Sequence, residues 1–270
     1  MPHPLCLAHL SLIELTPPDM VSAAAAADFK LVSLRLAPAT AEELRHPMIG
    51  DTPMMRETLA RLKALDVGVH DVELVRLDAE TDIYACEPLL EAAARLGAQQ
   101  VLVAGDDEDE SRTAEKFASL AELGARYDLR VGLEFMPWRG IRNLAAASRV
   151  IKAAGTGGVI VDAIHLDRSG GSSAELASLP LAQWAFFQIC DAPAQQPDNE
   201  AELLFQARRA RLAPGHGGLD LVGMLRTLPP DLVVSIEAPL HGRPDLLPPV
   251  ARARLLREAT LQLMASAHVD

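Results

Sequence analysis

Eight short apolar segments recur along the chain, beginning at residues 5, 31, 69, 100, 130, 158, 185 and 232. The stretches between them show helical spacing of apolar residues, as Leu59, Leu62 and Leu65 do after the helix-opening Asp51-Thr52-Pro53. Eight strands alternating with helices within about 250 residues is the pattern of a (β/α)8 barrel. An open doubly wound sheet usually carries a glycine-rich loop after its first strand, and residues 10–17 contain no glycine. We therefore predict an α/β fold, a single (β/α)8 TIM-barrel domain over residues 1–270.

Several segments between the strands carry specific expectations. Helices are predicted over 113–127, 200–209 and 245–265. After the sixth strand the chain at His165 is expected to fold over the barrel mouth, and a Gly/Ser loop at 169–173 is expected to lead to a short helix. The turn at 105–110 is strongly acidic. It lacks the ligand spacing and central glycine of a calcium loop, so we expect a solvated run of charge.

Four consecutive strands end in oxygen-bearing side chains. The apolar run Val159-Ile160-Val161 ends at Asp162, and the neighbouring strands deliver Glu134, Gln188 and Glu237 in the same way. In parallel barrels the carboxyl ends of the strands meet on one face, where active sites lie. Strands are about 4.8 Å apart, so four successive ends can converge on one point. The sequence thus predicts a shared site.

Three carboxylates brought together in this way repel one another unless a cation joins them. The donor atoms of Glu134, Asp162, Gln188 and Glu237 are all oxygen, which favours Mg²⁺ or Mn²⁺ over Zn²⁺. We therefore predict one divalent metal ion held by these four residues. The alternative is that each is a rim residue bonded to a nearby backbone amide.

Three further residues are candidates for contacting a substrate. His165 lies three residues past Asp162, where it can reach a substrate hydroxyl. Arg211 precedes the turn-rich segment 214–220 and can bind an anionic or hydroxyl-rich group. Trp138 follows the fifth strand and can form a wall of the pocket. Each residue also has a purely structural alternative. His165 could only hydrogen-bond within its own loop, Arg211 could belong to a plain surface loop, and Trp138 could pack in the core.

The overall composition limits the classes of partner that the protein can bind. The net charge of −12 and pI near 5.1 argue against nucleic acid, because phosphate binding needs a basic face. Three cysteines without paired spacing indicate no disulfide framework, and no apolar run approaches the length of a membrane span. We expect a cytoplasmic protein that acts on a small molecule without binding a membrane.

The chain resembles the xylose isomerase-like TIM-barrel superfamily, which includes sugar isomerases and epimerases, inosose dehydratases and endonuclease IV. The resemblance extends over nearly the whole chain. The segments that carry it are Leu133-Glu134-Phe135, Val161-Asp162-Ala163-Ile164-His165, Gln188-Ile189-Cys190-Asp191, Arg211-Leu212-Ala213-Pro214-Gly215 and Ser235-Ile236-Glu237.

The resemblance implies roles for individual residues. Glu134, Asp162, Gln188 and Glu237 match the metal ligands, Glu134 and Glu237 match the acid/base pair of the epimerases, and His165 matches a substrate contact. Three positions depart from related patterns. Gln188 stands where many epimerases have histidine, His216 where relatives commonly have glutamate, and Met136 where dehydroshikimate dehydratases typically have histidine.

The favoured hypothesis is a metal-dependent isomerase or epimerase of a keto-sugar or related polyhydroxy carbonyl compound, acting through a metal-stabilised enediolate. A dehydratase of a keto-inositol or dehydroshikimate-like substrate is the alternative on the same site. A non-catalytic barrel is the second alternative. The resemblance also brings nucleic-acid repair, against which the acidic charge argues. The identity of the carbohydrate-like substrate stays open, as does the oligomeric state, for which a homodimer is one expectation.

Overall fold

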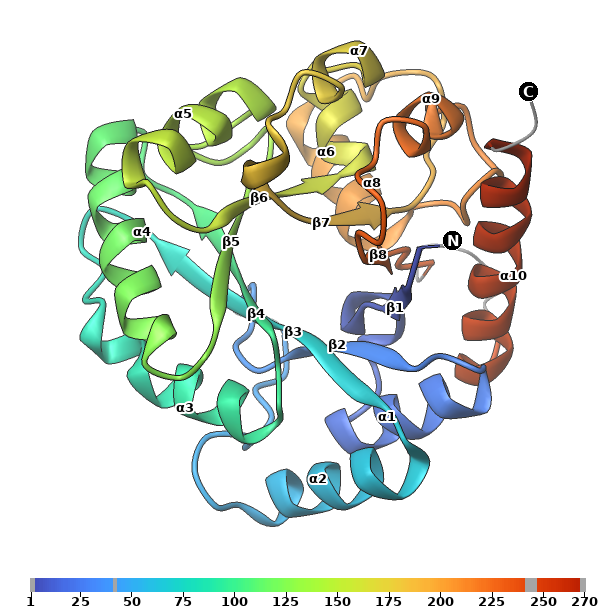
Figure 1. The fold of residues 1–270 in the computed structure, drawn as a ribbon. Helices are drawn as coiled ribbons and strands as arrows, with labels where there is room; N and C mark the ends of the chain where they lie inside the picture. Colours follow the sequence, from blue (N-terminus) through green and yellow to red (C-terminus); the bar gives the residue numbers. More distant parts are fainter. Residues whose placement is uncertain (1–2, 41–42, 241–246, 268–270) are drawn as a thin grey trace.

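The chain forms a closed barrel of eight parallel strands in sequential order, confirming the predicted (β/α)8 TIM barrel (Figure 1). The computed structural model describes residues 3–40, 43–240 and 247–267. The strands are β1 (Leu5–Leu7), β2 (Leu31–Arg35), β3 (Gly68–Leu77), β4 (Gln100–Gly105), β5 (Arg130–Glu134), β6 (Gly158–Asp162), β7 (Trp184–Ile189) and β8 (Val234–Ile236). Each lies within two residues of its predicted start.

Helices surround the barrel on its outside (Figure 1). They are α1 (Pro17–Ala26), α2 (Pro53–Leu65), α3 (Glu87–Arg95), α4 (Glu110–Ala125), α5 (Leu144–Ala154), α6 (Ala163–Arg168), α7 (Ser173–Leu176), α8 (Glu200–Arg209), α9 (Leu221–Leu225) and α10 (Pro249–Ala267), with short 3-10 turns η1 (His9–Leu12), η2 (Tyr84–Cys86) and η3 (Leu181–Gln183). Side-chain caps start several of them. Thr52, for example, accepts a hydrogen bond from the Met55 amide at the start of α2.

The strands are apolar on both faces because both faces are covered. Val101, Val131 and Val159 point outward and join the large core beneath the helices. Leu102, Ile160 and Phe186 form a second, smaller cluster. Their register places this cluster inside the barrel, on the face that also carries Glu134 and Asp162. A packed interior therefore lies beneath the strand ends.

Three local predictions are wrong. The chain directly after β6 does not fold over the barrel mouth, because the Asp162 carboxylate accepts a hydrogen bond from the Ile164 amide and starts α6. Helix α4 begins at Glu110, earlier than predicted, because Asp109 caps it. The acidic turn is a solvated run only in part: Glu108 and Asp109 are exposed, but Asp107 is buried and pairs with Arg112 at 2.5 Å.

The other helices match closely. Helix α8 has its predicted bounds, and α10 begins at Pro249, whereas residues 245 and 246 of the predicted closing helix lie outside the described part. All three cysteines are free. In the described part of the chain, none of the helices is both long and apolar enough to cross a membrane.

Candidate active site

The four predicted ligand residues lie at one end of the barrel. Glu134 and Asp162 are the last residues of β5 and β6, and Gln188 stands directly opposite Asp162 in the register of β7. Glu237 immediately follows β8. All four are at least 97% buried. Strand register therefore places these side chains at one end of the barrel, as the sequence predicts.

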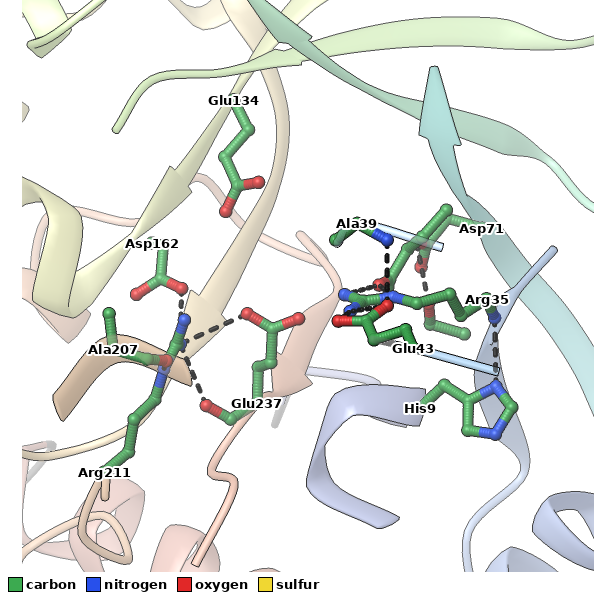
Figure 2. A network of polar contacts seen from close by, with 12 residues as sticks. His9, Arg35, Ala39, Glu43, Asp71, Glu134, Asp162, Ala207, Arg211 and Glu237 are labelled. Carbon is green, nitrogen blue, oxygen red and sulfur yellow. Dashed lines mark hydrogen bonds and ion pairs between the residues drawn. The ribbon is translucent and has the colours of Figure 1, made fainter. Parts of the chain in front are cut away.

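Arg211 joins two of these acids (Figure 2). Its Nη1 lies 2.6 Å from Asp162 Oδ2 and 3.1 Å from Glu237 Oε2, and it also donates to the Glu237 backbone carbonyl at 3.0 Å. Its Nε donates to the Ala207 carbonyl at the end of α8. The guanidinium is buried, so it neutralises part of the acid cluster from inside the site.

His165 lies in the first turn of α6 and is buried, not spread over the barrel mouth. Its Nε2 is 3.5 Å from Glu134 Oε1 and 3.7 Å from Asp162 Oδ2. The Trp138 ring packs edge-on against the imidazole at a centroid distance of 5.0 Å. Burial lowers the pKa of His165 to about 4, so the imidazole is neutral at neutral pH.

The carboxyl groups differ in their protonation. Burial, reinforced by the charges of Glu237 and Asp162, raises the pKa of Glu134 well above its ordinary value. Burial likewise raises the pKa of Glu237 to about 8, against the opposing effect of Arg211. Burial acts in the same direction on Asp162, but Arg211 and His165 outweigh it and lower its pKa. Asp162 is therefore the carboxyl group of the cluster whose ionised form is favoured most.

The donor atoms fit a divalent metal ion. Glu134, Asp162 and His165 each offer one ligand atom, and the three atoms lie within 4.8 Å of one another. Gln188 Oε1 is buried and has no hydrogen-bond partner among the described residues, which suits an additional ligand. This grouping includes the His165 imidazole, which the sequence assigned to substrate, and does not include Glu237. An imidazole donor suits Zn²⁺ as well as Mn²⁺.

A pocket opens onto the cluster. It has about 560 Å³ of empty space, counted with its open mouth, and Glu134, Glu237, His165, Arg211 and Trp138 all line it. Five of the residues selected from the sequence thus meet at one cavity. Asp162 and Gln188 are buried and are not among its lining residues.

Sequence reasoning missed a second polar group on the opposite side of the pocket (Figure 2). Arg35, at the end of β2, lines the pocket and pairs with Glu43 at 3.1 Å and with the buried Glu73. The Ser33 hydroxyl lies 2.6 Å from Glu73 and 2.9 Å from Asp71. The rule that selected Glu134 and Asp162, a polar residue ending an apolar strand, also selects Arg35 when it is applied to β2.

The turn-rich segment 214–220 is held by one carboxylate. Asp191 Oδ2 accepts from the Gly215 and Gly217 amides, and its Oδ1 accepts from the Ala192 and Leu219 amides. A Cβ on Gly217 would lie 2.3 Å from Asp191 Oδ1, so only glycine fits there. The segment fixes the chain just after Arg211, and His216 is exposed on its surface.

A closed parallel barrel with polar side chains gathered at its carboxyl-terminal strand ends is the architecture of the (β/α)8 enzymes, whose active sites lie on that face. The chain belongs to one such family, the xylose isomerase-like TIM barrels, whose model matches residues 21–259. The family predicted from the sequence is therefore confirmed.

Individual relatives show what this chain is similar to. A 3-dehydroshikimate dehydratase of Pseudomonas aeruginosa is 33% identical over 115 residues, which are 42% of this chain and 18% of that protein. The structure of IolI protein with a bound zinc atom has a TM-score of 0.78 at 15% identity, over 98% of this chain and 99% of that chain. A D-allulose 3-epimerase from Methylomonas has a TM-score of 0.71 at 12% identity, over 97% and 98%. The two structural likenesses concern the fold.

Proposed function

We propose that this chain is a divalent-metal-dependent enzyme that removes a proton from the carbon beside a carbonyl group in a small hydroxylated compound. One observation carries the proposal: Glu134, Asp162 and His165 place ligand atoms within 4.8 Å of one another under a pocket that Glu237 also lines. When bound, a divalent cation supplies positive charge that stabilises negative charge developing on substrate oxygens. Family membership supports enzymatic activity, because the named relatives are enzymes.

Glu134 is the proposed base. Its carboxyl group is buried and lines the pocket, and burial raises its pKa well above its ordinary value, which makes its ionised form a stronger base. Its contact with His165, 3.5 Å between Oε1 and Nε2, orients the carboxylate. Arg211 holds Asp162 ionised and keeps the Glu237 carboxylate in place.

Two outcomes follow proton removal, and we rank dehydration first. Glu134 and His165 are neighbours, so a carboxylate base lies beside a neutral imidazole that can hydrogen-bond the leaving hydroxyl group, and the proton that Glu134 has taken completes the water that leaves. Such a pair suits loss of a proton from one carbon and of a hydroxyl group, as water, from the next. The sequence similarity to a dehydratase supports the same ranking, although it extends over only part of this chain.

Isomerisation or epimerisation, which the sequence alone favoured, is the second candidate. Glu237 lines the same pocket as Glu134 and is the other carboxyl group with a raised pKa, near 8. A protonated Glu237 is able to return a proton to the substrate after Glu134 has taken one. The two candidates therefore share their first step and differ in the partner of Glu134.

The mass of the product separates the two outcomes. Ketoses, keto-inositols and cyclic hydroxyketones are incubated with the metal-loaded protein in D₂O. A product lighter by one water supports dehydration, whereas one of unchanged composition that carries a solvent deuteron supports isomerisation or epimerisation. Glu134→Gln is expected to abolish either reaction. Glu115→Gln, on the exposed part of α4, is the matched control. Full turnover by Glu134→Gln would remove Glu134 from the role of base.

A further inference from the structure

Two neighbouring side chains of the β5–α5 loop line the pocket and hold buried N–H groups without an acceptor. Trp138 Nε1 and Arg139 Nε have no hydrogen-bond partner within residues 3–40, 43–240 and 247–267. Buried donors in proteins are nearly always paired, because an unpaired one loses its hydration without compensation. Two adjacent exceptions in a pocket wall indicate a place for an acceptor supplied by a ligand.

The charged groups on this wall carry a net positive charge, which attracts the same kind of ligand as the two N–H donors do. Arg139 Nη1 lies 2.7 Å from Asp106 Oδ1, and Arg76 Nη2 lies 2.6 Å from the other oxygen of the same carboxylate. One carboxylate therefore faces two guanidinium groups. The Arg139 side chain is 12% exposed and that of Arg76 is 46% exposed, so the less solvated of the two charges is the one beside the pocket.

The unpaired donors lie close to the reacting centre. The Trp138 ring contacts the His165 ring at 5.0 Å, and His165 Nε2 is 3.5 Å from Glu134 Oε1. Glu134, Trp138 and Arg139 line the same pocket, so a small molecule whose α-carbon faces Glu134 is able to reach Trp138 and Arg139 with its far end. Its far end meets two N–H donors and a surplus positive charge.

We propose that Trp138 and Arg139 form a carboxylate-binding subsite, so that the substrate is a hydroxy-carbonyl acid and not a neutral sugar. The hydroxy-carbonyl part of this substrate, which faces Glu134, rests on the proposed function above. A carboxylate carries a single charge on two coplanar oxygens, which matches two adjacent donors and one surplus positive charge. A phosphate dianion would add a second negative charge beside Asp106, which makes the carboxylate the better match.

Binding calorimetry on the Mn²⁺-loaded protein tests the subsite with three probes that share the same vicinal diol. They are catechol, 3,4-dihydroxybenzoate and 3,4-dihydroxyphenylphosphonate; the diol resembles the planar enediolate, and only the anionic group differs. We expect 3,4-dihydroxybenzoate to bind about tenfold or more tightly than catechol, the effect of a charge-assisted hydrogen bond. Arg139→Gln removes this preference. Trp138→Phe, which keeps the ring against His165, reduces it.

Arg142→Gln is the matched control, because Arg142 lies in the same loop but is 61% exposed and pairs with Glu108. It is expected to keep the full preference. Equal binding of catechol and 3,4-dihydroxybenzoate, a preference that survives in both Arg139→Gln and Trp138→Phe, or tighter binding of the phosphonate would each overturn the subsite. Binding of none of the three probes would do so too. Catechol binding that does not depend on Mn²⁺ would instead count against the proposed function, so the two failures are distinguishable.

Discussion

Arg211 and Asp162 form a buried ion pair, with Nη1 2.6 Å from Oδ2, in the place where four strand ends bring together three acids and a glutamine. The same nitrogen reaches Glu237 at 3.1 Å. The protein therefore carries an internal cation inside its acid cluster. That cation compensates the repulsion between β6 and β8 that the sequence analysis assigned to a metal ion alone.

Removing this cation is expected to destabilise the fold. Arg211→Met keeps the length of the side chain but leaves Asp162 buried without its charge partner, and we expect the free energy of unfolding to fall by about 3–5 kcal/mol. Guanidinium denaturation at pH 7.5 measures the change. Arg209→Met, at the exposed end of α8, is the control and should change stability by less than about 0.5 kcal/mol. Wild-type stability of Arg211→Met would show that the ion pair contributes little.

Asp191 is expected to act on the site through Arg211. Asp191→Asn replaces one acceptor oxygen by a donor group, so that backbone amides of the 214–220 segment lose their partner, at a cost of about 1–3 kcal/mol. Substrate affinity should fall with it, since the segment fixes the chain beside Arg211. Asp220→Asn is the control, because that carboxylate caps α9 and lies outside the pocket. An Asp191→Asn variant with unchanged affinity would separate this segment from the site.

Gln188 and Gln100 provide a matched pair for testing the metal site. Both are buried glutamines whose Oε1 has no partner among the described residues, but Gln188 lies at the carboxyl end of β7 and Gln100 at the amino end of β4. We expect Gln188→Ala to weaken Mn²⁺ binding about tenfold or more. Gln100→Ala should leave it unchanged. Equal Mn²⁺ affinities in the two variants would remove Gln188 from the ligand set.

His9 is expected to contribute stability at neutral pH that is lost as the pH drops. Burial lowers the pKa of His9 in the folded state to about 4, from the ordinary value of 6.5. The unfolded chain therefore binds a proton that the folded chain does not, and the stability from neutral His9 is complete above pH 6.5 and decreases as the pH falls toward 4. At pH 5 the difference is about 2 kcal/mol.

Denaturation of His9→Gln at pH 7.5 and pH 5 checks this linkage. The variant should lose about 2 kcal/mol less than wild type between the two pH values, because glutamine does not titrate. The remaining pH dependence is the balance of two opposed effects. His70 and His165, whose pKa values burial also lowers to about 4, act in the same direction as His9, whereas the raised pKa values of Glu134 and Glu237 act in the opposite direction. His216→Gln, on the exposed loop, should retain the wild-type pH dependence. An identical slope in His9→Gln and wild type would contradict the assignment.

The barrel and the location of the site follow from local sequence patterns. Apolar runs that end in Glu134 and Asp162 identify both the strands and their functional ends. A parallel strand that is buried on both faces is apolar throughout, so an acid marks the point where it reaches the active-site face. Helix α6 was missed because its six residues are too short for a periodic signal, and only the cap at Asp162 marks its start. That helix places His165 among the acids and not over the mouth.

Contacts between segments that are distant in the sequence could not be predicted from local patterns. Arg211 meets Asp162 across 49 residues, and Arg35 meets Glu73 across 38, through loops and register that no local pattern specifies. Asp106 and Asp107 were read as solvated because acidic runs usually are. Their pairing with Arg139 and Arg112 depends on where the β5–α5 loop and α4 pack.

Metal content of the purified protein tests the central claim most directly. Elemental mass spectrometry is applied to gently purified protein, and again after the metal is stripped and Mn²⁺, Mg²⁺ or Zn²⁺ is added back. We predict about one tightly bound divalent ion per chain. The ion should be absent from Asp162→Asn and present in the control Asp167→Asn, which alters a partly exposed carboxylate on the same helix. Absence of a bound ion, together with no thermal stabilisation by any of the three metals, would contradict the account.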